Sequence, residues 1–504
     1  MPDSSDLIFE RATRYESRTA ILDVRGPHTY RDLLDASARV AAALLAGRDD
    51  LNEERVAFLI APGFSWVAVQ WGIWRAGGVA VPLPMGSPSA ELGYFIQDTG
   101  ASALISEAAN RETLASAASE CGGVAVRCYY ELLRSSPVAL PEIGADRRAM
   151  ILYTSGTTSR PKGVVTTHAN VTAQITSLTD AWEWSADDRI LLCLPLHHVH
   201  GIINVVSCAL WSGAVCEMLP RFEADVVWKR IGRGELTLFM AVPTIYFKLI
   251  TAWESYSTEH RAILRGGARR LRLMVSGSAA LPVNTLERWR EITGHTLLER
   301  YGMTEIGMAL SNPYRGERIP GTVGKPLPGV DVRLVDDSGN GVAEGTSGEI
   351  EVRGPNVFHE YWQRPEATCE AFRDGWFRTG DTAVVENSVY RILGRTNIDI
   401  LKTGGHKVSA LEIEETLREH AAIRECAVVG VPDPEWGERV CAALVLNDGY
   451  VLDLETLRAW AKDRLAVHKI PSRLLLLKDL PRNAMGKVTK PAVTKLFASE
   501  GSQA

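Results

Sequence analysis

The chain has 504 residues, which is more than one hydrophobic core normally serves, so at least two folding units are expected. Its 55 basic and 61 acidic residues give a formal net charge of −6 at pH 7, and this balance offers no basic field for nucleic acid. No polybasic run indicates a membrane surface, so a small-molecule substrate is the default expectation.

The first twenty residues carry mixed charges and no continuous apolar segment, which argues against a secretory signal and a transit peptide. The sequence also lacks a run of about twenty apolar residues that could span a bilayer. Eight cysteines are scattered without a Cys-x-x-Cys pair, so neither a zinc site nor a disulfide framework is indicated. We therefore expect a reduced, cytoplasmic protein that is a monomer or a homodimer.

The N-terminal region alternates strands and helices. An apolar run at 56–60 is followed by a helical pattern at 64–76, which two glycines end, and then by a short apolar run at 79–81 and another at 103–105. This order is typical of a parallel sheet with crossover helices. Three tryptophans in the helical segment are interpreted as core or interface packing, without a chemical role: Trp66, Trp71 and Trp74.

A run rich in hydroxyls and small residues, YTSGTTSRPKGV, occupies 153–164 after a short apolar strand. Glycine permits close approach of the backbone, Ser and Thr supply short donors, and Lys162 supplies a point charge for phosphate oxygens. The spacing is not that of a P-loop, because five residues separate Gly156 from Lys162 and Gly163 follows the lysine. A polar surface turn is the alternative, but the composition favours a phosphate-binding loop.

This run resembles the signature loop of the adenylate-forming superfamily, which includes acyl-CoA synthetases, peptide-synthetase adenylation domains and beetle luciferases. The family usually has glycine where this chain has Ser159. The resemblance implies an ATP phosphate cradle built from Thr154, Ser155, Gly156, Thr157, Thr158 and Lys162.

A predicted strand at 190–196 leads to three histidines, His197, His198 and His200, which we expect on a loop. Their spacing matches no familiar zinc motif, and no acidic or cysteine ligand stands nearby, so a metal site is not favoured. The segment LPLHHVHG resembles the next motif of the superfamily, in which the histidine at the position of His198 borders the acyl pocket and gates it. A hydrogen-bonded loop histidine remains the alternative for His197.

Predicted strands at 236–242 and 271–275 follow, and Pro243 is placed to open a helix. The second strand leads to Ser276-Gly277-Ser278-Ala279, a tight turn before a helix that starts near Pro282. Small residues at the carboxyl end of a parallel strand leave room for a flat ligand. By resemblance, Gly277, Ser278 and Ala279 line the adenine and acyl pockets.

The stretch LLERYGMTEIGM at 297–308 resembles the motif that holds the adenylate. Carried over by position, Tyr301 stacks on adenine, Thr304 contacts phosphate, and Glu305 binds Mg²⁺. An aromatic face suits a base, a hydroxyl suits an oxyanion, and a carboxylate suits a hard cation. Without the resemblance, Glu305 is an ordinary acidic residue.

Glycines and prolines crowd 323–340, and short strands follow to 353, which predicts a β subdomain. Further on, WFRTGD places Asp381 after a glycine, where the resemblance assigns its carboxylate to the ribose hydroxyls and a turn aspartate is the alternative. The composition changes at Arg395, which is counted with the nucleotide site, and a small α+β unit follows. The resemblance places Gly404 and Gly405 at the CoA channel, and the catalytic Lys487 on a loop that reaches the other domain.

The predicted fold class is α/β, with a large N-terminal domain of parallel-sheet subdomains plus a β subdomain at 1–395, and a small mobile α+β domain at 396–504. The motifs cover nearly the whole chain in the order of the superfamily. The resemblance implies an acid–CoA ligase that uses ATP, Mg²⁺ and coenzyme A and forms an acyl-adenylate, with Lys487 acting in that first step.

The segments GMTEIGMALSNP and PGTVGKPLPGV look most like malonyl-CoA synthetases, which activate malonate or methylmalonate. A second carboxylate needs a charged partner, and we expect Arg318, His200 and Ser276 to hold it. Alternatives are a medium- or long-chain fatty acyl-CoA synthetase, an adenylation enzyme that loads a carrier protein, and a luciferase-like oxygenase.

Overall fold

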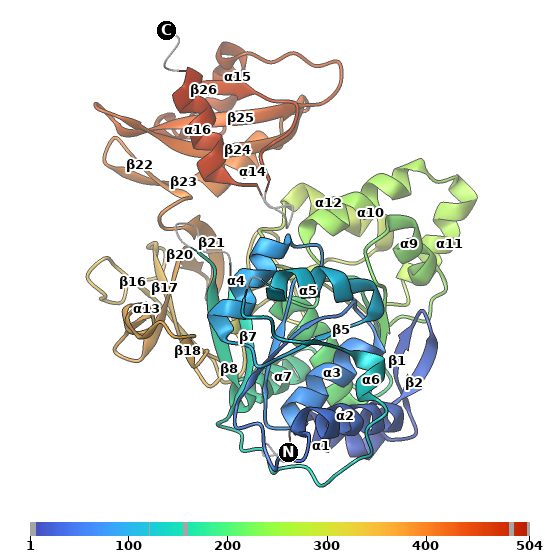
Figure 1. The fold of residues 1–504 in the computed structure, drawn as a ribbon. Coiled ribbons are helices and arrows are strands. Elements are labelled where there is room, and N and C mark those ends of the chain that lie inside the picture. Colours follow the sequence, from blue (N-terminus) through green and yellow to red (C-terminus); the bar gives the residue numbers. More distant parts are fainter. Residues whose placement is uncertain (1–6, 120, 155–159, 483–487, 501–504) are drawn as a thin grey trace.

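A computed structural model describes residues 7–119, 121–154, 160–482 and 488–500 (Figure 1). In this part of the chain, the strands form four sheets, two in the body of the molecule, one in a β subdomain and one in a C-terminal lobe. None of the helices in the described ranges has the length and apolarity that a bilayer crossing requires.

The first sheet of the body confirms the parallel sheet predicted for the N-terminal region. Neighbours β4, β3, β5 and β6 run parallel, and β7 and β8 form an antiparallel hairpin at one side. In spatial order its described strands are β18 (Glu360–Tyr361), β8 (Lys162–Thr167), β7 (Arg148–Thr154), β4 (Val79–Pro82), β3 (Arg55–Leu59), β5 (Ala103–Ser106) and β6 (Val126–Cys128).

The second sheet of the body is parallel at its centre and antiparallel at both edges. In spatial order its described strands are β15 (Lys325–Pro326), β14 (Gly307–Ser311), β13 (Leu298–Met303), β12 (Leu273–Ser276), β11 (Leu238–Ala241), β9 (Arg189–Leu192), β10 (Val215–Met218), β1 (Thr19–Asp23) and β2 (Gly26–Thr29).

Helices cover these two sheets because nearly every strand of the parallel centre is apolar on both faces. Trp66, Trp71 and Trp74 are buried on α3, as predicted. The helices of this part are α1 (Ile8–Arg11), η1 (Ala12–Tyr15), α2 (Tyr30–Leu45), α3 (Phe64–Arg75), α4 (Ser89–Thr99), η2 (Ala108–Asn110), α5 (Arg111–Ser119), α6 (Tyr129–Leu132), α7 (His168–Ala181), η3 (His200–Ser207), α8 (Cys208–Ser212), α9 (Ala224–Gly232), α10 (Pro243–Ser255), α11 (Thr258–Ala268) and α12 (Val283–Thr293).

The segment around His200 differs from the prediction of a strand at 190–196 and a loop after it. Strand β9 ends at Leu192, and His200 begins the π-helix η3. The segment from His200 to Ser207 is entirely buried, so its backbone groups need internal partners, and a helix supplies them. His197 and His198 precede this helix in a turn, which agrees with the predicted loop.

The predicted β subdomain is present as an antiparallel sheet, and its described strands are β16 (Asp331–Val335), β17 (Gly348–Arg353), β20 (Trp376–Glu386), β19 (Phe372–Arg373) and β21 (Val389–Arg395). The short helix α13 (Pro365–Ala371) leads into it. Strand β21 ends at Arg395, and the next strand belongs to the C-terminal sheet.

The C-terminal sheet consists, in the described ranges, of β23 (His406–Ser409), β22 (Ile400–Thr403), β25 (Gly437–Leu446), β24 (Ile423–Asp433) and β26 (Arg473–Leu476). Its helices are α14 (Ala410–Leu417), α15 (Leu454–Ala461), η4 (Val467–Lys469) and α16 (Lys490–Glu500). Alternate residues of β24 pack on opposite faces, so that Val428 lies under α14 and α15 and Val429 lies under α16.

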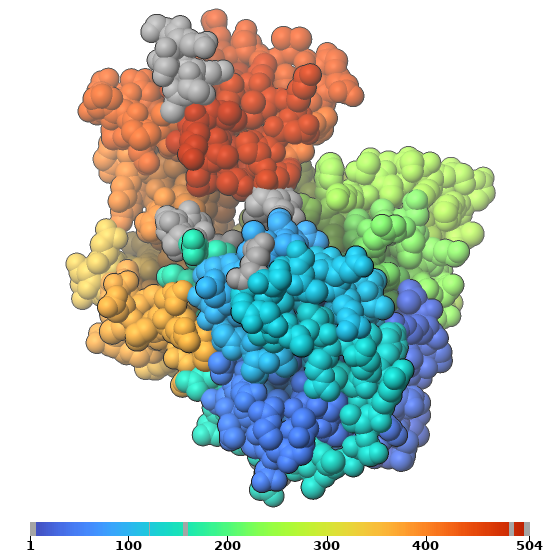
Figure 2. All heavy atoms as spheres, viewed as in Figure 1, coloured from blue at the N-terminus to red at the C-terminus, as the bar shows by residue number. Residues whose placement is uncertain are grey.

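The C-terminal lobe (orange to red) stands on the body of the molecule and is clearly set apart from it (Figure 2). It has two apolar clusters of its own, one on each face of its sheet. One contact between lobe and body joins two helices, since Glu415 of α14 accepts a hydrogen bond of 2.8 Å from the backbone N–H of Val283 in α12. A lobe with its own core, joined by polar contacts, is suited to move as a unit.

Candidate active site

The two ends of the predicted phosphate loop are held together by the β7–β8 hairpin, in which Thr154 is the register partner of Lys162. Residues Ser155, Gly156, Thr157 and Thr158 lie outside the described residues. The Lys162 ammonium is 5.0 Å from the ring centroid of Tyr361, a cation–π contact that directs the lysine toward β18. The hairpin therefore places the only lysine of the 153–164 run beside Tyr361.

Tyr361 also contacts the predicted metal ligand Glu305, because its hydroxyl donates a hydrogen bond of 3.0 Å to Oε1 of that carboxylate. Thr304 and Glu305 form the corner of a tight turn between β13 and β14, closed by a bond from Ile306 N to Met303 O. Burial raises the pKa of Glu305, while the hydrogen bond from Tyr361 opposes the shift. Lys162, Tyr361 and Glu305 thus form one continuous group, and Tyr361 was not predicted.

The predicted adenine and ribose residues also meet. The hydroxyl of Tyr301 donates a 2.6 Å hydrogen bond to Oδ2 of Asp381, and Arg395 Nε lies 3.0 Å from Oδ1 of the same carboxylate. Burial raises the pKa of Asp381, and the charge of Arg395 opposes the shift. Strands β13, β20 and β21 therefore bring three residues from distant parts of the sequence to one carboxylate.

His200 lies beside the turn that follows β12. Its Nδ1 is 3.3 Å from the hydroxyl of Ser278, a residue in the left-handed region with φ of +71°. Burial, assisted by the charges of Arg300 and His198, holds the pKa of His200 well below its usual range, so the ring is neutral at pH 7. His197 and His198 are neighbours with ring centroids 4.1 Å apart.

Arg300 was not predicted, although it lies inside the quoted LLERYGMTEIGM motif. Its side chain is 2% exposed, and among the described residues its Nε and Nη2 have no hydrogen-bond partner. A Cβ at position 277 would stand 2.6 Å from the guanidinium carbon, so the absence of a side chain at Gly277 leaves the room that the guanidinium occupies. Burial lowers the pKa of Arg300 to about 9, and the group is still cationic at neutral pH. A buried cation with free donors marks a place for an anion.

Arg318, the arginine predicted to hold a second carboxylate, has a different environment. Its guanidinium donates to three backbone carbonyls, Pro313 O at 3.1 Å, Thr296 O at 2.6 Å and Tyr314 O at 3.0 Å. Two of these bonds lie within the loop after β14, and the bond to Thr296 joins that loop to the segment before β13. Ser276, predicted with Arg318 and His200 to contact the second carboxylate, ends β12 and is fully buried. Its hydroxyl is unpartnered within the described ranges.

On the C-terminal lobe, Gly404 and Gly405 form the turn between β22 and β23, with φ of +54° and +81°. A Cβ at Gly404 would be 3.1 Å from the ring of Trp436, and the backbone N–H of Gly404 donates to Trp436 O at 2.9 Å. Lys487 lies outside the described residues. The two glycines thus form the tight turn at the end of the β22–β23 hairpin.

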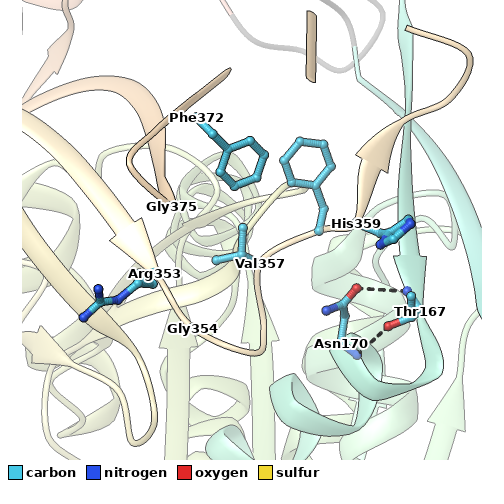
Figure 3. A pocket seen from close by; sticks show the side chains of 9 residues that line it. Thr167, Asn170, Arg353, Gly354, Val357, His359, Phe372 and Gly375 are labelled. Atoms are coloured by element: carbon cyan, nitrogen blue, oxygen red, sulfur yellow. Dashed lines mark hydrogen bonds between the residues drawn. The ribbon is translucent and has the colours of Figure 1, made fainter. Parts of the chain in front are cut away.

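A separate pocket of about 350 Å³ lies between α7 and the β subdomain (Figure 3). The described residues that line it are Thr167, Asn170, Arg353, Gly354, Val357, Phe358, His359, Phe372 and Gly375. Thr167 and Asn170 bond to each other as the cap of α7, at 3.0 and 3.1 Å. The predicted site residues that the structure describes are absent from this lining, so the pocket is distinct from the site above.

An α/β body, a β subdomain and a C-terminal lobe around these groups define the class of AMP-binding enzymes, and comparison with known families agrees. The model described as "AMP-binding enzyme" matches residues 8–362, and the model described as "AMP-binding enzyme C-terminal domain" matches residues 412–487. The chain therefore belongs to the AMP-binding enzyme family, which confirms the resemblance found in its motifs.

Individual relatives cover nearly the full length. The mitochondrial malonate–CoA ligase ACSF3 of Mus musculus is 47% identical, with 99% of this chain and 92% of the relative covered. The malonate–CoA ligase of Arabidopsis thaliana is 40% identical over 98% and 88%. The crystal structure of ATP-bound MatB from Rhodopseudomonas palustris matches with a TM-score of 0.89 at 35% identity, covering 98% of this chain and 99% of that one.

These relatives contradict the expected cytoplasmic location. Proteins from mouse, cattle, frog and human at 46 to 47% identity are all named as mitochondrial. The expectation rested on charge and hydropathy at the N-terminus, and such a pattern is weak evidence because targeting is read by receptors as well as by membranes.

Proposed function

We propose that this protein is an ATP-dependent malonate–CoA ligase. It activates malonate as malonyl-adenylate with release of pyrophosphate, and then transfers the malonyl group to the thiol of CoA with release of AMP. The names of the relatives in mouse and Arabidopsis support this substrate, and so does the match to MatB. Activation is needed because a free carboxylate has only oxide as its leaving group, whereas AMP leaves readily.

The observation that carries the choice of a dicarboxylate is the buried guanidinium of Arg300. Two of its nitrogens have no partner in the described part of the protein, and His200 and the Gly277-Ser278 turn lie beside it. A planar guanidinium can bind the distal carboxylate of malonate through two parallel hydrogen bonds. We assign this part to Arg300 in place of Arg318, whose guanidinium donates to three backbone carbonyls. His200 and Ser276 remain in the proposed acyl site.

The nucleotide is proposed to lie between the phosphate hairpin and Asp381. The carboxylate of Asp381 would accept the ribose hydroxyls, with Tyr301 and Arg395 holding its position. The adenine would lie against Tyr301 and the turn at Gly277, Ser278 and Ala279.

The phosphates would lie against the loop from Thr154 to Lys162 and against Thr304. Mg²⁺ fits at Glu305, because Tyr361 binds Oε1 and the carboxylate can offer its second oxygen to a hard cation. When bound, the ion would neutralise phosphate charge during attack on the α-phosphorus.

Two further assignments belong to the proposal. The domains are divided at Arg395, into 1–395 and 396–504, which is supported by the change of sheet after β21 and by the separate core of the lobe. Lys487 would stabilise the developing charge in adenylation, and rotation of the lobe would then bring Gly404 and Gly405 to the pantetheine of CoA. His198 would border the acyl pocket.

A panel of carboxylic acids tests the function. With ATP, Mg²⁺ and CoA, we expect malonate and methylmalonate to exceed acetate, butyrate and octanoate in kcat/KM by a wide margin, with AMP as the nucleotide product. Pyrophosphate should appear on adding malonate before CoA is present. Release of ADP would contradict the mechanism, and a preference for a medium- or long-chain acid would contradict the substrate.

A further inference from the structure

Asn204 is a buried amide whose side chain is unpaired in the described part of the chain. It is 0% exposed, and neither its Nδ2 nor its Oδ1 has a hydrogen-bond partner among the described residues. Leaving a buried polar group unpaired costs the free energy of its lost hydration, and native proteins rarely do so. An asparagine in this position therefore calls for a partner that the described residues do not supply.

The surroundings of Asn204 show where that partner binds. Asn204 is the fifth residue of η3, a helix in which Ile202, Ile203, Val205 and Val206 are buried and apolar. Because the hydrogen bonds of a π-helix join residues five positions apart, one turn takes between four and five residues. Asn204, four positions after His200, therefore lies on nearly the same face of η3 as His200. His200 faces the hydroxyl of Ser278, at 3.3 Å.

Ser207, the last residue of η3, shows how a buried polar side chain is normally satisfied in this helix. Its hydroxyl donates a hydrogen bond of 2.8 Å to the carbonyl of Ile202. Asn204 has no such bond in the described structure, although its amide has two donors and an acceptor. Within η3, the Asn204 amide is thus unpaired among the described residues, whereas the Ser207 hydroxyl is satisfied by the helix itself.

We propose that Asn204 is a specificity-determining residue, whose Nδ2 donates a hydrogen bond to the distal carboxylate of the bound dicarboxylate at the inner end of the acyl site. The proposal rests on the proposed function. A carboxylate accepts about four hydrogen bonds, so it can take two from Arg300 and a further one from Asn204. A monocarboxylic acid of similar length leaves both groups unpaired and is rejected for that reason.

Two replacements of nearly the same size test this inference. Asn204→Leu removes the donor and suits the apolar helix, and Asn204→Asp replaces the donor with a negative charge. We expect Asn204→Leu to lower kcat/KM for malonate by about 10- to 100-fold, the effect of one hydrogen bond to a charged group. The kcat/KM for butyrate should be unchanged or higher in Asn204→Leu. The loss in kcat/KM for malonate should be greater in Asn204→Asp than in Asn204→Leu.

Ser207→Ala is the matched control, because it alters a buried polar residue of the same helix that already has a partner. It should leave the ratio of malonate to butyrate kcat/KM unchanged. KM for ATP, measured in each variant, should stay within threefold of wild type, which a general loss of structure would not allow. If Asn204→Leu does not fold, Asn204→Ala gives the same comparison.

The outcomes separate this inference from the proposed function. If wild type uses malonate but the malonate-to-butyrate ratio stays within threefold in both Asn204 variants, the amide binds only ordered water and the inference on Asn204 alone is overturned. If wild type does not use malonate, the proposed function fails, and the inference on Asn204 fails with it.

Discussion

Arg300→Met is expected to stabilise the free protein and to destroy its use of malonate. The guanidinium is 2% exposed, and its Nε and Nη2 are unpaired in the described structure. The neighbouring Glu299 does little to balance the charge of Arg300 at pH 7. Burial raises the pKa of the Glu299 carboxyl to about 8, so this carboxyl is mostly neutral. Arg300 is thus a buried cation whose charge is poorly compensated by the described residues.

The expected changes in Tm and in malonate kcat/KM follow from the free-energy cost of a buried charge. Replacing buried ionic groups with apolar ones of similar volume often stabilises a protein by about 1–4 kcal/mol, so we expect Tm to rise by about 1 to 4 °C. Stripping one partner from a buried charge pair costs about 3–5 kcal/mol, which is a loss of about 10²- to 10⁴-fold in malonate kcat/KM. Butyrate should be activated as well as by wild type, or better.

Differential scanning fluorimetry without ligands and an AMP-release assay with malonate and butyrate measure the two effects. Arg318→Met is the matched control, because it removes donors from three backbone carbonyls. The Arg318→Met replacement should lower Tm and leave the ratio of kcat/KM for malonate to kcat/KM for butyrate unchanged. A lower Tm for Arg300→Met with equal losses for both acids would refute the reasoning, and so would a changed acid ratio in Arg318→Met.

Three further predictions concern the nucleotide site and the protein's response to pH. Lys487→Ala should slow pyrophosphate release by at least about 10²-fold but spare thioester formation from supplied malonyl-adenylate; equal losses in both half-reactions would argue against domain alternation. Asp381→Asn should raise KM for ATP by about 10- to 100-fold, and an unchanged KM would remove the ribose role. Burial raises the pKa of Glu299 from 4.5 to about 8, so its contribution to stability is fully present below pH 4.5 and lost as the pH rises through 8. Melting scans should therefore show Tm falling more steeply over this range in wild type than in Glu299→Gln; parallel curves would contradict it.

Local patterns were sufficient to predict the architecture. The strands β3, β4 and β5 are short apolar runs that alternate with helical segments. A short, continuous apolar run is typical of a parallel strand that is buried on both faces of its sheet. In the C-terminal unit, the antiparallel strands β24 and β25 also contain apolar runs. Boundaries shifted where tertiary packing intervened, as at β9, which stops at Leu192.

Motif order was sufficient to predict the family and to name candidate residues of the site. Tyr301, Glu305 and Asp381 could be named because each stands in a motif that resembles one of the adenylate-forming superfamily. Their contacts could not be named, because the bond from Tyr301 to Asp381 joins residues eighty positions apart and depends on how β13 and β20 approach each other. The same is true of Tyr361, whose contacts to Lys162 and Glu305 come from three separate segments.

The sequence by itself determined the fold class, the family and the type of chemistry, because these depend on periodicity and on motifs that are contiguous in the chain. Only the tertiary structure decided which arginine has guanidinium nitrogens without a partner among the described residues. Arg300 and Arg318 are the same type of residue, and they differ in burial and in the hydrogen-bond partners that the fold gives them. The hydrogen bonds that a side chain has left to offer a ligand depend on every group packed around it, and that packing exists only in the folded chain.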